Sequence, residues 1–227
     1  MKTIIITGAA SGLGKSISEE FDKKKCNLVL CDRNLIDIKK YKNQVLFFKI
    51  DLTDEKQIKK LFDETLKKFK KIDIVINNAG ITDKKHFSEF SSKEIDNIMD
   101  VNFKAVTIST NLAYKHMKKG VIATISSLGG IVSLKNYSAY SASKHAVEGY
   151  LKSVRKEMDK KIKIIIFRPF RLDTNLNKKS KIKSPSKHRL DPKIYAEYVV
   201  ATINRQILKS SYYFLRNWVI WIGKIIF

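Results

Sequence analysis

Short runs rich in β-branched residues alternate along this chain with longer amphipathic segments. The short runs predict strands, and the amphipathic segments, whose apolar residues recur at helical spacing, predict helices. Strands that alternate with helices pair in parallel and are covered by helices on both faces. We therefore predict a doubly wound α/β fold in a single domain, residues 1–227. The predicted strands are 2–7, 27–31, 45–49, 73–76, 121–125 and 162–167, and the predicted helices are 15–25, 55–70, 93–118 and 139–159.

The first candidate site follows the first predicted strand, because parallel sheets bind ligands beyond the carboxyl ends of their strands. Residues 7–14, TGAASGLG, leave this strand and open the first helix. Glycines permit a tight turn and let a pyrophosphate approach the helix-terminal N–H groups. A purely structural turn would have the same composition. The contacts that this loop predicts for a dinucleotide are Gly8, Ser11, Gly12, Leu13 and Gly14.

Asp32 ends the second predicted strand, where its carboxylate would accept hydrogen bonds from both hydroxyls of an adenosine ribose. The same charge would repel a 2′-phosphate, so we predict NAD as the preferred cofactor. Arg33 leaves NADP as an alternative, because a guanidinium can pair with a phosphate. Helix capping is the structural alternative for Asp32. Asp51 and Leu52 follow the third strand, where Asp51 would face adenine or cap the next helix.

Two further segments follow predicted strands. Residues 77–80, NNAG, combine small and amide side chains, and Asn77, Ala79 and Gly80 are candidate contacts for a ribose. Residues 140–144, YSASK, open a helix after the fifth strand. A tyrosine and a lysine at i and i+4 share a helical face, and a neighbouring ammonium favours phenolate. We therefore predict that Lys144 lowers the pKa of Tyr140 into a range useful for proton transfer.

These residues resemble the classical short-chain dehydrogenase/reductase (SDR) family over roughly residues 2–215. The matching motifs are TGxxxGxG at 7–14, NNAG at 77–80, and YxxxK at Tyr140 and Lys144, together with Asn102 and Ser127. The family's spacing between serine and tyrosine selects Ser127 over Ser126. The motifs stand in the family's order, each at an expected strand end.

The resemblance implies a Rossmann-like fold and an NAD(P)-dependent oxidoreductase acting on a small carbonyl or secondary alcohol. Tyr140 would be the general acid in reduction and the general base in oxidation. Lys144 would hold the nicotinamide ribose, and Ser127 would hydrogen-bond the reacting oxygen. Asn102 would position a water that connects Lys144 to solvent. The family also implies a homodimer or a homotetramer.

The segment after the sixth strand departs from the family in one position. Phe170 stands where a glycine usually follows the proline, here Pro169, while Thr174 matches the residue expected at the nicotinamide carboxamide. Residues 175–193 would cover the substrate. The six cations from Lys178 to Arg189 would attract an anionic substrate. The alternative is a solvated lid that shares the lysine excess of the whole chain.

The carboxyl end is the least family-like stretch. We expect a short strand over 212–214 and an apolar helix over 215–227. Its two tryptophans, flanked by cations, would suit peripheral membrane contact, whereas packing on a partner subunit or over the lid is the alternative. The apolar run 218–222 is too short to span a bilayer, and no secretory signal is visible.

Charge and cysteine content bound the remaining classes. The net charge is +23, but only seven of the 45 basic residues are arginine, the residue that nucleic-acid readers concentrate at bidentate contacts. We therefore expect no nucleic-acid partner and interpret the charge as compositional, with an electrostatic role as the alternative. Cys26 and Cys31 lack metal-ligand spacing, so we expect no metal and a reduced, cytoplasmic compartment, with membrane association as the alternative.

The alternative function is a catalytically silent dinucleotide-sensing or scaffold protein with the same fold. The complete set of Asn102, Ser127, Tyr140 and Lys144 argues against it, because a sensor needs no proton-transfer group.

Overall fold

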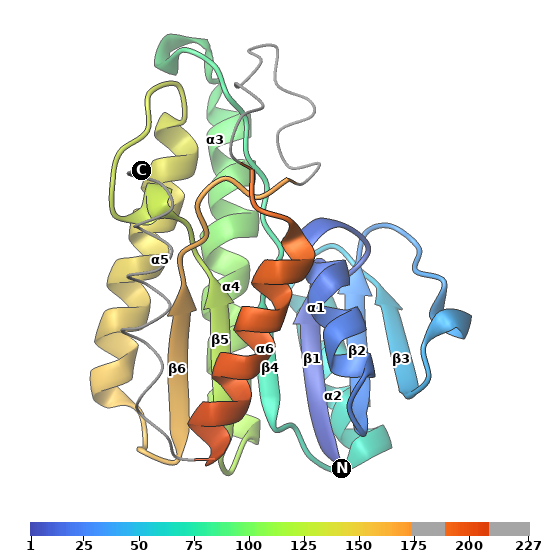
Figure 1. Ribbon diagram of the computed structural model, residues 1–227. Helices are drawn as coiled ribbons and strands as arrows, with labels where there is room; N and C mark the ends of the chain where they lie inside the picture. Colours follow the sequence, from blue (N-terminus) through green and yellow to red (C-terminus); the bar gives the residue numbers. More distant parts are fainter. Residues whose placement is uncertain (174–188, 209–227) are drawn as a thin grey trace, which may run out of the picture.

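The computed structural model describes residues 1–173 and 189–208. In these ranges six strands form one sheet in the order β3-β2-β1-β4-β5-β6, with all neighbours parallel (Figure 1). The predicted doubly wound fold is confirmed, and each strand begins and ends within one residue of its predicted bounds. The strands are β1 Lys2–Thr7, β2 Cys26–Asp32, β3 Gln44–Lys49, β4 Ile74–Asn77, β5 Gly120–Ile125 and β6 Ile162–Phe167.

Helices cover both faces of the sheet because successive side chains of a buried strand point to opposite sides. In β1, Ile4 and Ile6 pack with residues of α1 and α6, whereas Ile5 packs with residues of α2, α4 and α5. Phe21 of α1 and Phe62 of α2 are fully buried in these two layers. The helices are α1 Gly12–Asp22, α2 Glu55–Phe69, α3 Ser92–Met99, α4 Ala105–His116, α5 Ser138–Glu157 and α6 Pro192–Leu208.

The strand order reverses between β1 and β4. The chain runs from β1 to β2 and β3 on one side and then crosses to β4 on the other side of β1. In doubly wound sheets the crevice for a ligand opens at such a point. Here the backbone N–H groups of Asn78 and Ala79, after β4, both donate to Thr7 Oγ1 at 3.0 Å, so the glycine loop and the NNAG segment lie side by side.

The predicted helix over residues 93–118 is divided in the structure. Between α3 and α4 the five residues Asp100–Lys104 form a π-helical turn, η3, in which the Ala105 N–H bonds to Asp100 O. Such turns often occur at functional sites. The prediction of one continuous helix was wrong because this turn contacts a residue that is distant in sequence. The Asn102 side chain accepts from the Ile81 N–H and donates to Ile81 O, both at 2.8 Å.

Helix α6 was not predicted, although its signals are present in the sequence. Asp191 Oδ1 accepts from the Lys193 N–H at 2.8 Å, and Pro192 occupies the first helical position. Tyr195, Val199 and Ile203 recur every four residues and are buried in the layer that contains α1. The predicted lid therefore overlapped the beginning of a core helix.

Several predictions fall outside the described residues. These are Thr174, most of the predicted lid, the strand at 212–214 and the apolar segment 215–227. In the described ranges, no helix combines the length and the apolar composition that crossing a bilayer requires.

Candidate active site

The glycine loop makes a close-packed turn between β1 and α1. Gly8 and Gly12 have φ of 67° and 53°, a region that favours glycine. A Cβ added to Gly14 would lie 2.0 Å from Gly8 O, so no side chain fits there. The Ser11 side chain makes no capping bond, and the first turn of α1 holds no acidic residue, which leaves the amino end of this helix suited to an anion. Leu13 packs into the core, so only its backbone can face a ligand.

Asp32 ties the end of β2 to this loop. Its Oδ2 accepts from the Ala10 N–H at 3.0 Å and its Oδ1 from the Asn34 N–H at 2.9 Å. The second bond resembles a cap, but no helix starts at Asn34, so the capping alternative is not what the structure shows. Each carboxylate oxygen can accept a further bond, and Arg33 beside it is exposed.

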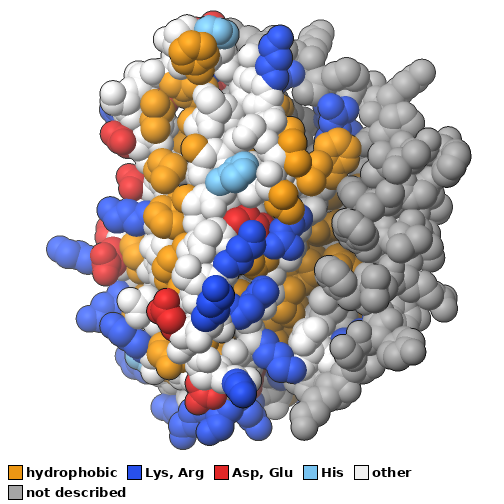
Figure 2. All heavy atoms as spheres, turned by 90° about the vertical axis from the view of Figure 1, so that its left-hand side faces the viewer, with side chains coloured by type: hydrophobic (Ala, Val, Ile, Leu, Met, Phe, Trp, Pro, Cys, Tyr) orange, Lys and Arg blue, Asp and Glu red, His pale blue; other side chains and the backbone are white. Residues whose placement is uncertain are grey.

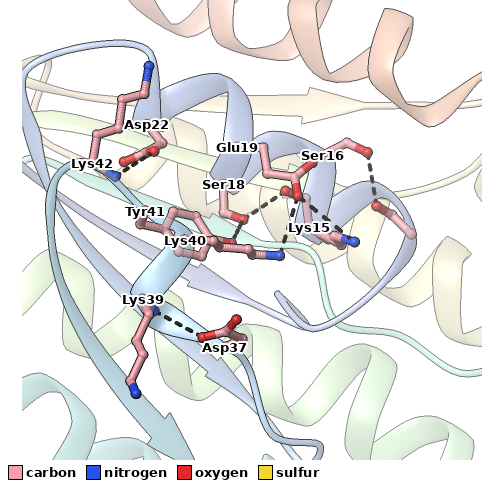
Figure 3. A network of polar contacts seen from close by, with 11 residues as sticks. Lys15, Ser16, Ser18, Glu19, Asp22, Asp37, Lys39, Lys40, Tyr41 and Lys42 are labelled. Carbon is pink, nitrogen blue, oxygen red and sulfur yellow. Dashed lines mark hydrogen bonds and ion pairs between the residues drawn. The ribbon is translucent and has the colours of Figure 1, made fainter.

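The connection that follows Asp32 is held against α1 (Figure 3). Ser18 Oγ and the Tyr41 hydroxyl lie 2.7 Å apart, and Lys40 Nζ lies 3.5 Å from Glu19 Oε1 (Figure 3). Asp22 accepts from the backbone of Lys42 at 2.9 Å. These bonds fix the chain between β2 and β3.

Asp51 and Asn77 play structural parts that their motifs did not reveal. Asp51 Oδ1 accepts from the Thr53 N–H and hydroxyl, both at 2.9 Å. The residue that caps α2 is Asp54, three positions later, so the capping alternative for Asp51 was wrong. Asn77 Nδ2 donates to Thr110 and Thr124 inside the protein. Leu52 and Asn77 both line a small cavity of about 10 Å³.

Asn78 is the residue of the NNAG segment that sequence reasoning missed. Its Nδ2 donates to Thr7 O at 2.9 Å and to Gly8 O at 3.1 Å, and so holds the glycine loop in place. Both asparagines belong to the same NNAG motif, and the sequence contains no signal that distinguishes the role of Asn78 from that of Asn77. Ala79 and Gly80 follow it at the crevice.

Ser127 and Tyr140 meet beside Gly129. Ser127 Oγ accepts from the Gly129 N–H at 3.0 Å, and it lies close enough to the Tyr140 hydroxyl to lower the pKa of that phenol. A Cβ on Gly129 would lie 3.4 Å from both Ser127 Oγ and Tyr140 Cε1. The ring of Tyr137, one turn earlier in the chain, has its centroid 6.2 Å from that of Tyr140. The structure thus brings together the two groups expected to hold a reacting oxygen.

Lys144 lies beneath them in the interior. It is 4% exposed, its Nζ donates to Ile125 O at 3.0 Å, and it lies 5.8 Å from the centroid of the Tyr140 ring. A Cβ on Gly80 would lie 3.6 Å from Lys144 Nζ and 3.3 Å from Asn102 Oδ1. Asn102 Nδ2 also donates to Ser143 Oγ at 3.0 Å. The four expected catalytic residues therefore gather at one place.

The two titratable groups are shifted by burial. Burial lowers the pKa of Lys144 to about 8, and attraction to Glu148 opposes the shift. Burial raises the pKa of Tyr140, while the bond from Ser127 lowers it and Tyr137 raises it. The predicted lowering of the Tyr140 pKa by Lys144 is therefore not seen in the structure, because Lys144 directs its ammonium to a backbone carbonyl and desolvation of the phenol is the larger effect.

The segment after β6 closes the site on one side. Pro169 O accepts from the Leu128 N–H at 3.2 Å, which ties this segment to the turn after Ser127. The departure from the family at Phe170 coincides with an unusual backbone at the next residue: Arg171 has φ of 34°, and its guanidinium lies 5.4 Å from the Phe170 ring centroid.

Comparisons with known proteins show the family of this chain. The family model described as short chain dehydrogenase matches residues 2–184. The 11-beta-hydroxysteroid dehydrogenase-like 2 protein of Arabidopsis thaliana is 35% identical over 186 residues, covering 77% of this chain and 60% of that protein. The chain thus spans about 60% of the length of this curated relative.

Solved structures give the same fold. The 3-ketoacyl-(acyl-carrier-protein) reductase of Brucella melitensis, complexed with NADH, superposes with a TM-score of 0.79 at 26% identity, over 90% of this chain and 91% of that one. An alcohol dehydrogenase of Thermococcus sibiricus, complexed with 5-hydroxy-NADP, gives a TM-score of 0.82 at 22% identity, over 90% and 91%. The chain belongs to the short-chain dehydrogenase family.

The residues at the crevice fit a nicotinamide dinucleotide. The cradle formed by Gly8 and Gly14 excludes side chains where a pyrophosphate would lie. Gly80 leaves open the space before Lys144 and Asn102. In the described chain, Thr82 Oγ1 and Ser126 Oγ are buried hydroxyls without a hydrogen-bond partner, so this region holds unused polar groups.

Burial of Lys144 predicts a pH-dependent effect on stability. The folded lysine keeps its proton to about pH 8 and the unfolded one to 10.5, so between these values the unfolded chain binds more protons and stability rises with pH. The penalty is therefore full below pH 8. Thermal unfolding should show Lys144→Met gaining stability relative to wild type below pH 8, with the gain shrinking toward pH 10.5.

Lys152→Met is the matched control, because Lys152 lies on the same helix with 61% of its side chain exposed. Its difference from wild type should stay constant over this pH range. A constant difference for Lys144→Met as well would contradict the burial of a charged lysine.

Proposed function

We propose that this protein is an NAD-dependent oxidoreductase. It transfers a hydride between nicotinamide and either the carbonyl carbon of a small ketone or aldehyde or the carbinol carbon of a secondary alcohol. One observation carries the proposal. Ser127, Tyr140 and Lys144 lie close together beyond the carboxyl ends of the strands, beside a glycine loop that fits a pyrophosphate. The bound nicotinamide supplies or accepts the hydride. The protein's part is orientation and proton transfer.

Tyr140 is proposed as the group that moves the proton. In reduction, the carbonyl oxygen gains negative charge as the carbon accepts hydride, and the Tyr140 hydroxyl donates its proton to that oxygen. The raised pKa of Tyr140 keeps the phenol protonated at neutral pH, as a general acid requires. In oxidation the same atoms act in reverse, and the tyrosinate removes the alcohol proton.

Ser127 and Lys144 are proposed to support this transfer. Ser127 Oγ already contacts the phenol, so an oxygen between the two hydroxyls would accept bonds from both. The Lys144 ammonium would bond the nicotinamide ribose from its place behind Gly80. Asn102 is proposed to connect Lys144 to solvent through a water.

Asp32 is proposed to select NAD over NADP. Its carboxylate is fixed by the glycine loop on one oxygen and by Asn34 on the other, and each oxygen can accept a ribose hydroxyl. A 2′-phosphate at the same place would meet a negative charge. Pro169 and Thr174 are the proposed contacts at the nicotinamide end.

The alternative is a protein that binds the dinucleotide and performs no turnover. It would need the glycine loop and Asp32 but would gain nothing from burying Lys144, whose desolvation opposes folding at neutral pH. This cost favours the enzyme.

We also propose that the chain forms a homodimer or a homotetramer. Figure 2 shows the face at the left of Figure 1, beside α5, where apolar side chains lie between groups of Lys and Arg. Apolar surface rimmed by charge suits a contact between two copies. Light scattering of the purified chain would measure the assembly.

Replacing Tyr140 with phenylalanine should abolish proton transfer and leave binding intact. The ring and its packing remain, and only the hydroxyl is lost. Turnover of NADH with a panel of ketones and aldehydes should fall by about 10²–10⁴-fold, while NADH binding by fluorescence stays unchanged. Tyr137→Phe, which removes a nearby hydroxyl, should keep turnover. Persistent turnover in Tyr140→Phe would exclude Tyr140 as the acid, and a wild type that binds NADH but reduces no compound would favour the sensing protein.

Replacing Asp32 with alanine should change the cofactor preference. Loss of two charge-assisted bonds to the ribose should weaken NADH binding by about tenfold or more, and NADPH binding should gain relative to it. Fluorescence titration with each cofactor measures the ratio. The matched variant Arg33→Ala should leave NADH affinity unchanged and weaken NADPH. An identical ratio in Asp32→Ala and wild type would show that another group sets the preference.

A further inference from the structure

An ion pair between a buried carboxylate and a partly exposed guanidinium lies one helical turn beyond Lys144. Glu148, on α5, is 2% exposed, and its two carboxylate oxygens accept from Arg168 Nε at 2.8 Å and Arg168 Nη2 at 2.7 Å. This fork is the strongest geometry for such a pair. Lys152 Nζ, 3.8 Å from Glu148 and mostly exposed, adds little.

A contribution to the stability of the fold does not explain well why this ion pair is present. Taking a carboxylate out of water costs several kcal/mol, and apolar replacement of buried pairs is often neutral or stabilising. The location of the pair is more informative. Gly130 follows Gly129, three residues after Ser127, and a Cβ added to it would meet Lys144 O at 2.9 Å and Glu148 Cγ at 3.1 Å. The stem of Glu148 therefore packs directly under the turn that follows Ser127.

Arg168 is held by the same strand ends that hold Ser127. It stands between Phe167 and Pro169, whose carbonyls accept from the Ser126 N–H at 2.8 Å and the Leu128 N–H at 3.2 Å. These two N–H groups flank Ser127. The guanidinium is thus fixed relative to the site, and it fixes the carboxylate in turn.

Several groups surround the Lys144 ammonium. Ile125 O accepts its hydrogen bond from β5, Asn102 lies opposite Gly80 on η3, and the Tyr140 ring lies one turn earlier on α5. These groups carry no negative charge while the phenol is protonated. Glu148 supplies the negative charge that favours the protonated lysine, against the burial that lowers its pKa to about 8.

We propose that Glu148 is a positioning residue of the active site, whose carboxylate favours the charged form of Lys144 inside the protein, and that Arg168 fixes this carboxylate in place while partly neutralising its charge. A neutral Lys144 would donate less strongly to a ribose, because hydrogen bonds from a charged donor are the stronger ones. The inference rests on the proposed role of Lys144 in the function above. It adds a carboxylate and a guanidinium on which the charge of that lysine depends.

The test is the ionisation of Lys144 in the full chain, followed by NMR of ¹³Cε-labelled lysine and assigned by the signal lost in Lys144→Arg. Wild type should titrate near 8. Glu148→Gln keeps the shape and removes the charge, so the midpoint should fall by roughly one pH unit. Arg168→Gln frees the carboxylate from its competing cation, so the midpoint should rise. Lys152→Gln, which removes only an exposed cation, should leave it unchanged.

Opposite shifts in the two variants are the signature of the proposed role, because general loosening of the site would move both midpoints upward toward the value in water. An unchanged midpoint in Glu148→Gln, or shifts of the same sign in both variants, would overturn the proposal. If Glu148→Gln fails to fold, the double variant Glu148→Gln/Arg168→Gln decides it, because it differs from Arg168→Gln only in the carboxylate. Its midpoint should lie below that of Arg168→Gln, and an equal or higher midpoint would overturn the proposal. The measurement needs no turnover, so a wild type that reduces no ketone would count against the proposed function alone.

Discussion

The burial of one ammonium group, that of Lys144, is the constraint on which the rest of the site depends. The charge is held in the interior by a single backbone carbonyl at the end of β5 and by attraction to Glu148. Without these two contacts, burial would lower the pKa of Lys144 further and favour its neutral form. The elements that supply the contacts must therefore be held accurately in place. The end of β5 fixes the carbonyl, and α5 fixes the spacing of Tyr140, Lys144 and Glu148 at one residue per turn. The site is therefore a property of the whole sheet edge.

The same edge supplies the other half of the site. Parallel strands end together, so the turn after β1, the carboxylate at the end of β2 and the amides after β4 are brought together by topology. Asn78 and Thr7 tie β4 to the glycine loop, and Asp32 ties β2 to it. A loop fixed from two sides can present its N–H groups to a pyrophosphate without first being ordered by it.

The sequence predicts this arrangement where its signals are local. β-branched runs predict the six strands, and the spacing of Tyr140 and Lys144 predicts their shared face. It fails where the deciding contact is distant: the π turn at Asn102 depends on Ile81, and the raised pKa of Tyr140 depends on burial by the whole fold. Helix α6 is a different case, because its signal is local. Tyr195, Val199 and Ile203 recur at helical spacing in the sequence, directly after a segment that was expected to be a lid.

The central claim is that this edge delivers a hydride to carbon and a proton to oxygen. The most direct measurement is to incubate the wild-type chain with a mixture of ketones and NADH deuterated at both C4 positions, and to analyse the alcohols by mass spectrometry. The account predicts one deuterium on the carbinol carbon of each product and a solvent-derived proton on its oxygen. Bound NADH with no deuterated alcohol, or an alcohol without carbinol deuterium, would contradict it.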